Sequence, residues 1–123
     1  MEYKILVVDD EENMLALLKR VLGKAGYRVS CVDGGKGALQ IATESHFHLA
    51  IVDVSMPGMD GLEVLRRLKL IDKKLPVIMI SAFASWDKEQ TAKHLGCVEY
   101  FSKPLNMKHF KSVVRKSIEE ATG

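Results

Sequence analysis

Five polar residues, spread along a chain of 123 residues, are of the types that handle phosphate and divalent cations. They are three carboxylates, a hydroxyl and an ammonium group: Asp9, Asp10, Asp53, Ser81 and Lys103. Carboxylate oxygens are ligands that Mg²⁺ prefers, while an ammonium group binds phosphoryl oxygens as a point charge. A carboxylate can also be the nucleophile that accepts a phosphoryl group. If the fold brings these side chains together, the sequence predicts phosphoryl transfer onto an aspartate.

Alternating strand-like and helix-like segments could supply that fold. Short apolar or alternating runs, typical of strands, cover residues 3–8, 27–32, 49–52, 77–80 and 98–101. Apolar residues at helical spacing follow each run, at 12–25, 36–44, 62–70 and 87–95, and after Asn106, which can cap the last helix. Three of the strands are continuously apolar, which is typical of a parallel sheet covered by helices on both faces. The sequence therefore predicts an α/β fold of five βα units.

The second strand indicates the order of the sheet. Residues 27–32 alternate apolar with polar side chains, as a strand at the edge of a sheet does. Combined with right-handed crossovers, this pattern favours a flavodoxin-like, doubly wound (βα)5 sandwich whose parallel five-stranded sheet has the order 2-1-3-4-5. A chain of this length is large enough for one core, so we expect residues 1–123 to form a single domain.

The ends of the predicted strands bring the polar residues together. Asp9 and Asp10 follow the first strand and Asp53 follows the third, so their carboxylates meet where the strand order reverses, the usual ligand site of such sheets. Three close carboxylates repel one another, and a cation among them would compensate this repulsion. A site with oxygen ligands and without sulfur or imidazole suits Mg²⁺. Ser81 and Lys103 reach the same rim from the last two strands. We therefore expect Asp53 to be the nucleophile. The Ser81 hydroxyl and the Lys103 ammonium group should face the carboxylates.

The motifs of the chain resemble those of bacterial response-regulator receiver domains along its whole length. They are an acidic pair after the first strand, Asp53 followed by MPGMDG at 56–61, Ser-Ala at 81–82, and Tyr100 with Lys-Pro at 103–104. The resemblance implies a role in two-component signalling, with a sensor histidine kinase or a small phosphodonor supplying a phosphoryl group to the aspartate. It also implies a regulatory domain rather than an enzyme, one that catalyses only its own phosphorylation and dephosphorylation.

The resemblance assigns roles to further residues. It implies that the backbone carbonyl of Ser55 joins Asp10 and Asp53 in binding Mg²⁺. Asp9 would help through a bound water. The residues expected to have structural roles are Pro57, Gly58, Gly61 and Pro104, the last after a cis peptide bond.

The resemblance further implies a conformational switch. Phosphorylation would draw Ser81 towards the phosphate and turn Tyr100 from an exposed to a buried rotamer. The change would reshape an output face made by the helix at 87–95, the strand at 98–101 and the last helix. An effector domain, a target protein or a second receiver would dock there. Trp86 lies near this face, and the sequence leaves it open between core, rim and partner contact.

The composition excludes several other classes. A formal net charge of +2 is too small to argue for direct nucleic acid binding. The longest apolar stretches are strand-length, far short of the about 20 residues of a membrane span, and no signal peptide is visible at the start. We therefore expect a cytoplasmic protein without membrane contact. Cys31 and Cys97 have no metal-like spacing, so buried, reduced thiols are expected.

Competing functions fit the sequence less well. A flavin carrier of similar fold would need a hydroxyl-rich phosphate loop where this chain has the four acids 9–12, and an aspartate-nucleophile phosphatase carries a DxD motif after its first strand. A degenerate receiver, acting only as a binding module, would lack part of the acidic set. The segments around Asp53 and at 81–86 resemble receivers of transcription activators, so we expect the N-terminal regulatory domain of a transcriptional regulator. The alternative is a stand-alone receiver or phosphorelay intermediate that acts by protein docking.

Overall fold

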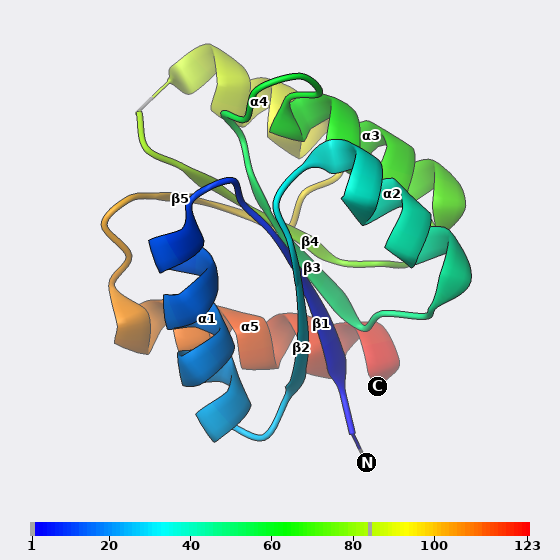
Figure 1. Ribbon diagram of the computed structural model, residues 1–123, viewed down its shortest axis with the longest axis vertical. Helices are drawn as coiled ribbons and strands as arrows, with labels where there is room; N and C mark the ends of the chain where they lie inside the picture. Colours follow the sequence, from blue (N-terminus) through cyan, green and yellow to red (C-terminus); the bar gives the residue numbers. More distant parts are fainter. Residues whose placement is uncertain (1, 84) are drawn as a thin grey trace.

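Strands and helices alternate throughout the computed structural model, which describes residues 2–83 and 85–123 (Figure 1). The strands in this part are β1 (Lys4–Val8), β2 (Arg28–Val32), β3 (Leu49–Asp53), β4 (Val77–Ser81) and β5 (Glu99–Ser102). The helices are α1 (Glu12–Lys24), α2 (Gly35–Glu44), α3 (Gly61–Ile71), α4 (Trp86–His94) and α5 (Met107–Thr122). Every predicted segment is present, with small shifts at the ends.

The five strands form one parallel sheet in the order β2-β1-β3-β4-β5, which confirms the predicted flavodoxin-like topology. Helices α1 and α5 cover one face of the sheet, and α2, α3 and α4 cover the other (Figure 1). Strand β2 is partly exposed along its length, whereas β3 and β4 are buried throughout. The alternating pattern of residues 27–32 therefore marks the sheet edge, as expected.

Two hydrophobic cores flank the sheet because successive strand residues point to opposite faces. In β1, Ile5 and Val7 pack with Phe110 of α5, while Leu6 and Val8 pack with Leu65 of α3. The core under α1 and α5 also contains Leu18, Leu22, Leu49, Ile51, Ile78, Ile80, Val114 and Ile118. Both cores hold the strands rigidly, so the strand ends are fixed points from which functional side chains can project.

Some local expectations differ from the structure. Helix α2 begins at Gly35, one residue earlier than expected. Gly35 is buried against α3, where a Cβ would lie 2.8 Å from a Val64 methyl carbon. Cys31 and Cys97 are free thiols, as expected, but each is only partly buried. Both thiols lie at the margins of the cores, and burial still raises the pKa of Cys97 to about 11. Among the described residues, no helix is both long and apolar enough to cross a membrane.

Candidate functional site

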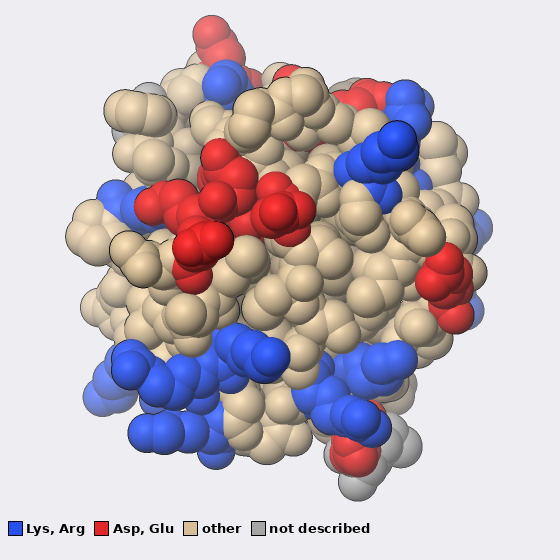
Figure 2. Space-filling model, viewed as in Figure 1, with Lys and Arg blue, Asp and Glu red and all other residues tan. Residues whose placement is uncertain are grey.

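Three carboxylates meet at the carboxyl ends of β1 and β3. Asp9, Asp10 and Asp53 each offer an oxygen within 4.8 Å of the others. The buried members are Asp9, 1% exposed, and Asp53, 4% exposed, while Asp10 faces solvent. Figure 2 shows acidic side chains gathered above α1, at the place where β1 ends in Figure 1. The predicted convergence of the strand-end acids is therefore present.

Lys103 supplies the positive charge of this crevice. Its Nζ lies 3.2 Å from Asp9 Oδ2 and 3.7 Å from Asp53 Oδ2, and it also donates to a Glu11 carboxylate oxygen. The Lys103 backbone amide donates to the Ser81 carbonyl at 2.7 Å, which fixes the lysine against the end of β4. The side chain is only 12% exposed, so its ammonium group is largely enclosed by carboxylates.

The electrostatics of the crevice favour a further cation. Burial, and then the neighbouring Asp9 carboxylate, raise the pKa of Asp53 to about 6, although Lys103 and the Ser55 amide oppose the shift. Burial alone would lower the pKa of Lys103. The carboxylates of Glu11, Asp9 and Asp53 outweigh that effect, so the pKa of the ammonium is raised. The buried acids are thus not fully compensated by one lysine.

The turn after β3 closes tightly over Asp53. The Ser55 amide donates to Asp53 Oδ1 at 3.2 Å, so one oxygen of the carboxylate is already oriented. Gly61 begins α3 and donates its amide to the Val54 carbonyl at 2.8 Å, and a Cβ on Gly61 would lie 2.0 Å from the Asp53 carbonyl oxygen. Between them Gly58 has a φ of +81°, which favours glycine. Pro57, beside it, is exposed on the same turn.

Ser81 ends β4 at the same rim but does not donate to the carboxylates. Its hydroxyl donates to the Phe83 carbonyl at 2.7 Å and accepts from the Phe83 amide at 3.2 Å. A buried hydroxyl needs partners, and the turn after β4 provides them. The expectation that both donors face the acids therefore holds for Lys103 and not for Ser81 in this conformation.

Two expectations near β5 concern the peptide bond before Pro104 and the rotamer of Tyr100, and only the first matches the structure. The Lys103–Pro104 peptide bond is cis, as expected. Tyr100 was expected to be exposed before phosphorylation, but it is 9% exposed, so its ring is already buried, and its hydroxyl has no hydrogen-bond partner among the described residues. Trp86 begins α4 and is 74% exposed, which removes the core from the three alternatives left open for it.

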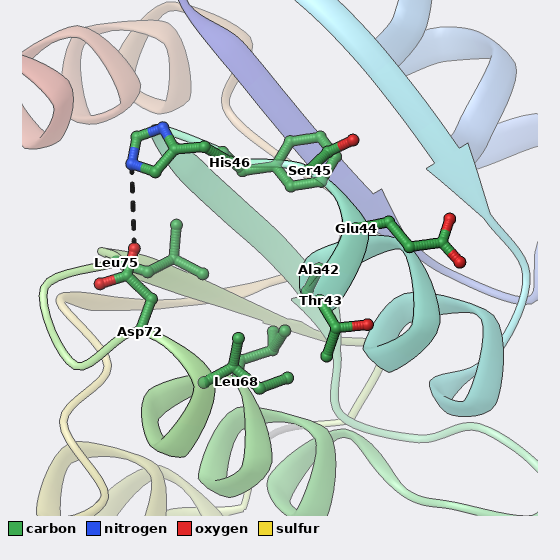
Figure 3. A pocket seen from close by; sticks show the side chains of 10 residues that line it. Ala42, Thr43, Glu44, Ser45, His46, Leu68, Asp72 and Leu75 are labelled. Atoms are coloured by element: carbon green, nitrogen blue, oxygen red, sulfur yellow. Dashed lines mark ion pairs between the residues drawn. The ribbon is translucent and has the colours of Figure 1, made fainter.

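Glu11 is the residue of the site that the sequence did not reveal. It follows the acidic pair, but its contact with Lys103 joins residues 92 positions apart. Its place as the third of four consecutive acids was the available signal. A separate hollow of about 380 Å³ lies beside the segments that lead into β3 and β4, at the other end of these strands from Asp53, and its lining includes His46, Leu68 and Asp72 (Figure 3). It contains none of the predicted site residues.

Comparison with known proteins identifies the family. The pattern of the response regulator receiver domain matches residues 5–115 of this chain. The chain belongs to this family, whose members are signalling domains of two-component systems rather than conventional enzymes, controlled by phosphorylation and partnered by histidine kinases and effector domains. Receiver domains generally bind Mg²⁺ at an acidic pocket, and the cluster of Asp9, Asp10 and Asp53 corresponds to such a pocket.

Relatives of different lengths share this domain. The chain is 38% identical over 116 residues to sporulation initiation phosphotransferase F of Bacillus subtilis, with 94% of each chain covered. It is 34% identical to the transcriptional regulatory protein YkoG of B. subtilis, of which it spans 51%, and 28% identical to regulatory protein AtoC of Escherichia coli, of which it spans 25%. The receiver domain protein of Methanospirillum hungatei has a similar structure, with a TM-score of 0.96 at 25% identity, covering 99% of this chain and 98% of the other.

Proposed function

We propose that this domain accepts a phosphoryl group on Asp53 from a phosphohistidine of a sensor kinase, or from a small phosphodonor, in a reaction that requires Mg²⁺. The observation that carries the proposal is the buried Asp53 carboxylate, held beside Asp9 and 3.7 Å from the Lys103 ammonium group. Phosphoryl transfer needs mainly positioning and neutralisation of charge, which these groups can provide. That residues 1–123 form one receiver domain is part of this proposal.

The donor set fits Mg²⁺. Its ligands would be carboxylate oxygens of Asp9, Asp10 and Asp53, which lie within 4.8 Å of one another, with Asp9 acting through water and with the Ser55 carbonyl as an additional ligand. A bound Mg²⁺ would neutralise negative charge on the carboxylates and on the incoming phosphoryl oxygens. The raised pKa of Asp53 supports the need for such a cation, because it reflects burial next to a second carboxylate.

The other steps of phosphoryl transfer would depend on side chains and a backbone amide of this chain. Asp53 would be the nucleophile, and the Ser55 amide holds its Oδ1 while Oδ2 faces Lys103. A phosphoryl group on this carboxylate would be within reach of the ammonium, which would neutralise its oxygens. Ser81 would contribute its hydroxyl only after releasing Phe83. The domain would thus catalyse its own phosphorylation and dephosphorylation and no other reaction.

Phosphorylation by a small donor tests the proposal directly. The protein is incubated with acetyl phosphate and Mg²⁺, and intact mass spectrometry is expected to show one added phosphoryl group. Asp53→Asn should show none, whereas Asp33→Asn, which changes an exposed carboxylate that makes no described ion pair or hydrogen bond, should behave as the wild type. Modification of Asp53→Asn, or no modification of the wild type with Mg²⁺ present, would rule out Asp53 as the acceptor.

We further propose that phosphorylation acts on the output face formed by α4, β5 and α5. Exposed apolar side chains support a docking role for this region: Phe83 is 73% exposed, Trp86 74% and Val98 49%. Helix α4 buries only Ala92, so it is weakly attached and suited to moving. Ser81 and Tyr100 would couple the phosphate to this face. Formation of a receiver homodimer on phosphorylation is expected to be detectable by sedimentation after treatment with beryllofluoride and Mg²⁺.

Two downstream roles are consistent with the relatives. We favour a regulatory domain that controls transcription, because the chain resembles transcriptional regulatory proteins such as YkoG and ZraR at 34% and 32% identity. The 38% identity with a sporulation phosphotransferase over 94% of both chains favours a phosphorelay intermediate as the second candidate. Transfer of phosphate from the phosphorylated domain to a histidine phosphotransfer protein would support the second role. Phosphate that stays on Asp53 in that mixture would support the first.

A further inference from the structure

The Lys103 ammonium group has a partner that the proposed phosphorylation chemistry does not require. Asp9 and Asp53 contact it from the protein interior, since their side chains are 2% and 4% exposed. Glu11 contacts it as well, and its side chain is 57% exposed. Glu11 therefore approaches the ammonium from the solvent side, which is the side from which a phosphodonor must arrive.

Glu11 lies immediately before the first residue of α1. Glu11 is the N-cap residue of α1, a position where the short side chains of Ser, Thr, Asp and Asn are the usual hydrogen-bond acceptors for helix amides. Its side chain makes no such capping bond. The Glu11 amide instead donates to Asp9 Oδ1 at 2.9 Å, which fixes its backbone beside the acidic crevice. The Glu11 side chain thus forms an ion pair with Lys103 and does not cap α1.

We propose that Glu11 is a positioning residue that holds Lys103 in the unphosphorylated protein and competes with phosphoryl oxygens for its ammonium group. The inference rests on the proposed function of Asp53. During phosphorylation by acetyl phosphate, an Asp53 oxygen forms a bond to phosphorus, while the bond from phosphorus to the acetate oxygen breaks and acetate leaves with the electron pair. Lys103 must then exchange the Glu11 carboxylate for a phosphoryl oxygen, so Glu11 opposes the phosphorylated state.

Matched variants at the start of α1 separate this contact from a general charge effect. Glu11→Gln removes the ion pair with Lys103. Glu12→Gln removes the same charge one residue further along, where Glu12 is exposed and makes no ion pair or side-chain hydrogen bond in the described part of the chain. Both changes weaken the interaction of an acid with the N-terminus of α1, and both reduce repulsion of an anionic donor. A difference between them therefore reports the contact itself.

The measurement is the affinity for beryllofluoride, a phosphoryl mimic, at saturating Mg²⁺. We expect Glu11→Gln to bind it about two- to five-fold more tightly than Glu12→Gln, the range expected for loss of a competing exposed ion pair. The ¹⁵N resonance of the Lys103 ammonium should move in Glu11→Gln before any ligand is added, and should stay in place in Glu12→Gln. The Mg²⁺ affinity of the two variants should be equal.

The outcomes distinguish this inference from the proposed function. If the wild type and both variants bind beryllofluoride with equal affinity, Glu11 does not compete for Lys103, although Asp53 remains the acceptor. Weaker binding by Glu11→Gln than by Glu12→Gln would also overturn the inference, because Glu11 would then assist Lys103. If acetyl phosphate fails to modify the wild type, the proposed function itself is wrong.

Discussion

At the scale of single residues, the site holds Asp53 in an environment that opposes its charge. The carboxylate is 4% exposed and lies beside Asp9, so burial and repulsion raise its pKa to about 6. Its ordinary value is 3.8. The folded protein therefore binds more protons than the unfolded chain between these two values, and stability must fall as the pH rises through this window. The buried, ionised Asp53 carboxylate therefore lowers the free energy of unfolding at neutral pH.

A comparison of Asp53→Asn with the wild type tests whether ionised Asp53 destabilises the folded protein. In EDTA, the free energy of unfolding of the wild type should fall by about 2 kcal/mol relative to Asp53→Asn between about pH 4 and pH 7. The asparagine variant has no carboxyl group to titrate at this position. Urea unfolding at a series of pH values measures the difference. Asp33→Asn should follow the wild-type curve, and a parallel curve for Asp53→Asn would contradict the raised pKa.

At the scale of elements, the junction between β3 and α3 determines where Asp53 lies. Gly61 is the first residue of α3, and a Cβ there would lie 2.0 Å from the Asp53 carbonyl oxygen and 2.6 Å from the Val54 Cα. Both atoms belong to backbone at the end of a buried strand and cannot move without shifting Asp53. The helix must therefore begin with glycine to pack this closely.

Gly61→Ala should accordingly destabilise the protein by more than about 2 kcal/mol, since the clash is with backbone rather than with a flexible side chain. Gly23→Ala is the matched control within α1, where no atom lies within 4 Å of the added Cβ. Because alanine is the better helix former, the control should stabilise by about 0.5–1 kcal/mol. Thermal and urea unfolding measure both changes. Equal stability of the two variants would show that the close approach is not rigid.

The elements were more predictable from sequence than the contacts between their side chains. The alternation at 27–32 indicated the edge strand, and strand ends indicated where Asp53 and Lys103 would meet, since backbone topology fixes both. The Ser81 bond to Phe83 and the Glu11 contact with Lys103 were not predicted. Each depends on which of several partners a side chain chooses once the fold is formed, and no spacing in the sequence encodes that choice.

At the scale of the whole molecule, α4 buries fewer residues than any other helix in the described part of the chain. Helices α1 and α5 bury many large side chains against one face, including Leu22, Phe110 and Ile118. On the other face α4 buries only Ala92, and it follows directly from the turn in which Ser81 bonds Phe83. A change at the strand ends should therefore reach the surface through α4, because that element resists movement least.

Trp86 offers a direct measure of this transmission because it is the only tryptophan of the chain and begins α4. Adding beryllofluoride and Mg²⁺ should draw Ser81 away from Phe83 and move the start of α4, where Trp86 lies. Since the indole is already 74% exposed, movement or docking should mainly reduce its exposure, so its fluorescence should shift to shorter wavelengths. Asp53→Asn should not respond. Ser81→Ala should retain Mg²⁺ binding but show a smaller shift, and a full shift in Ser81→Ala would mean that the signal reaches α4 by another route.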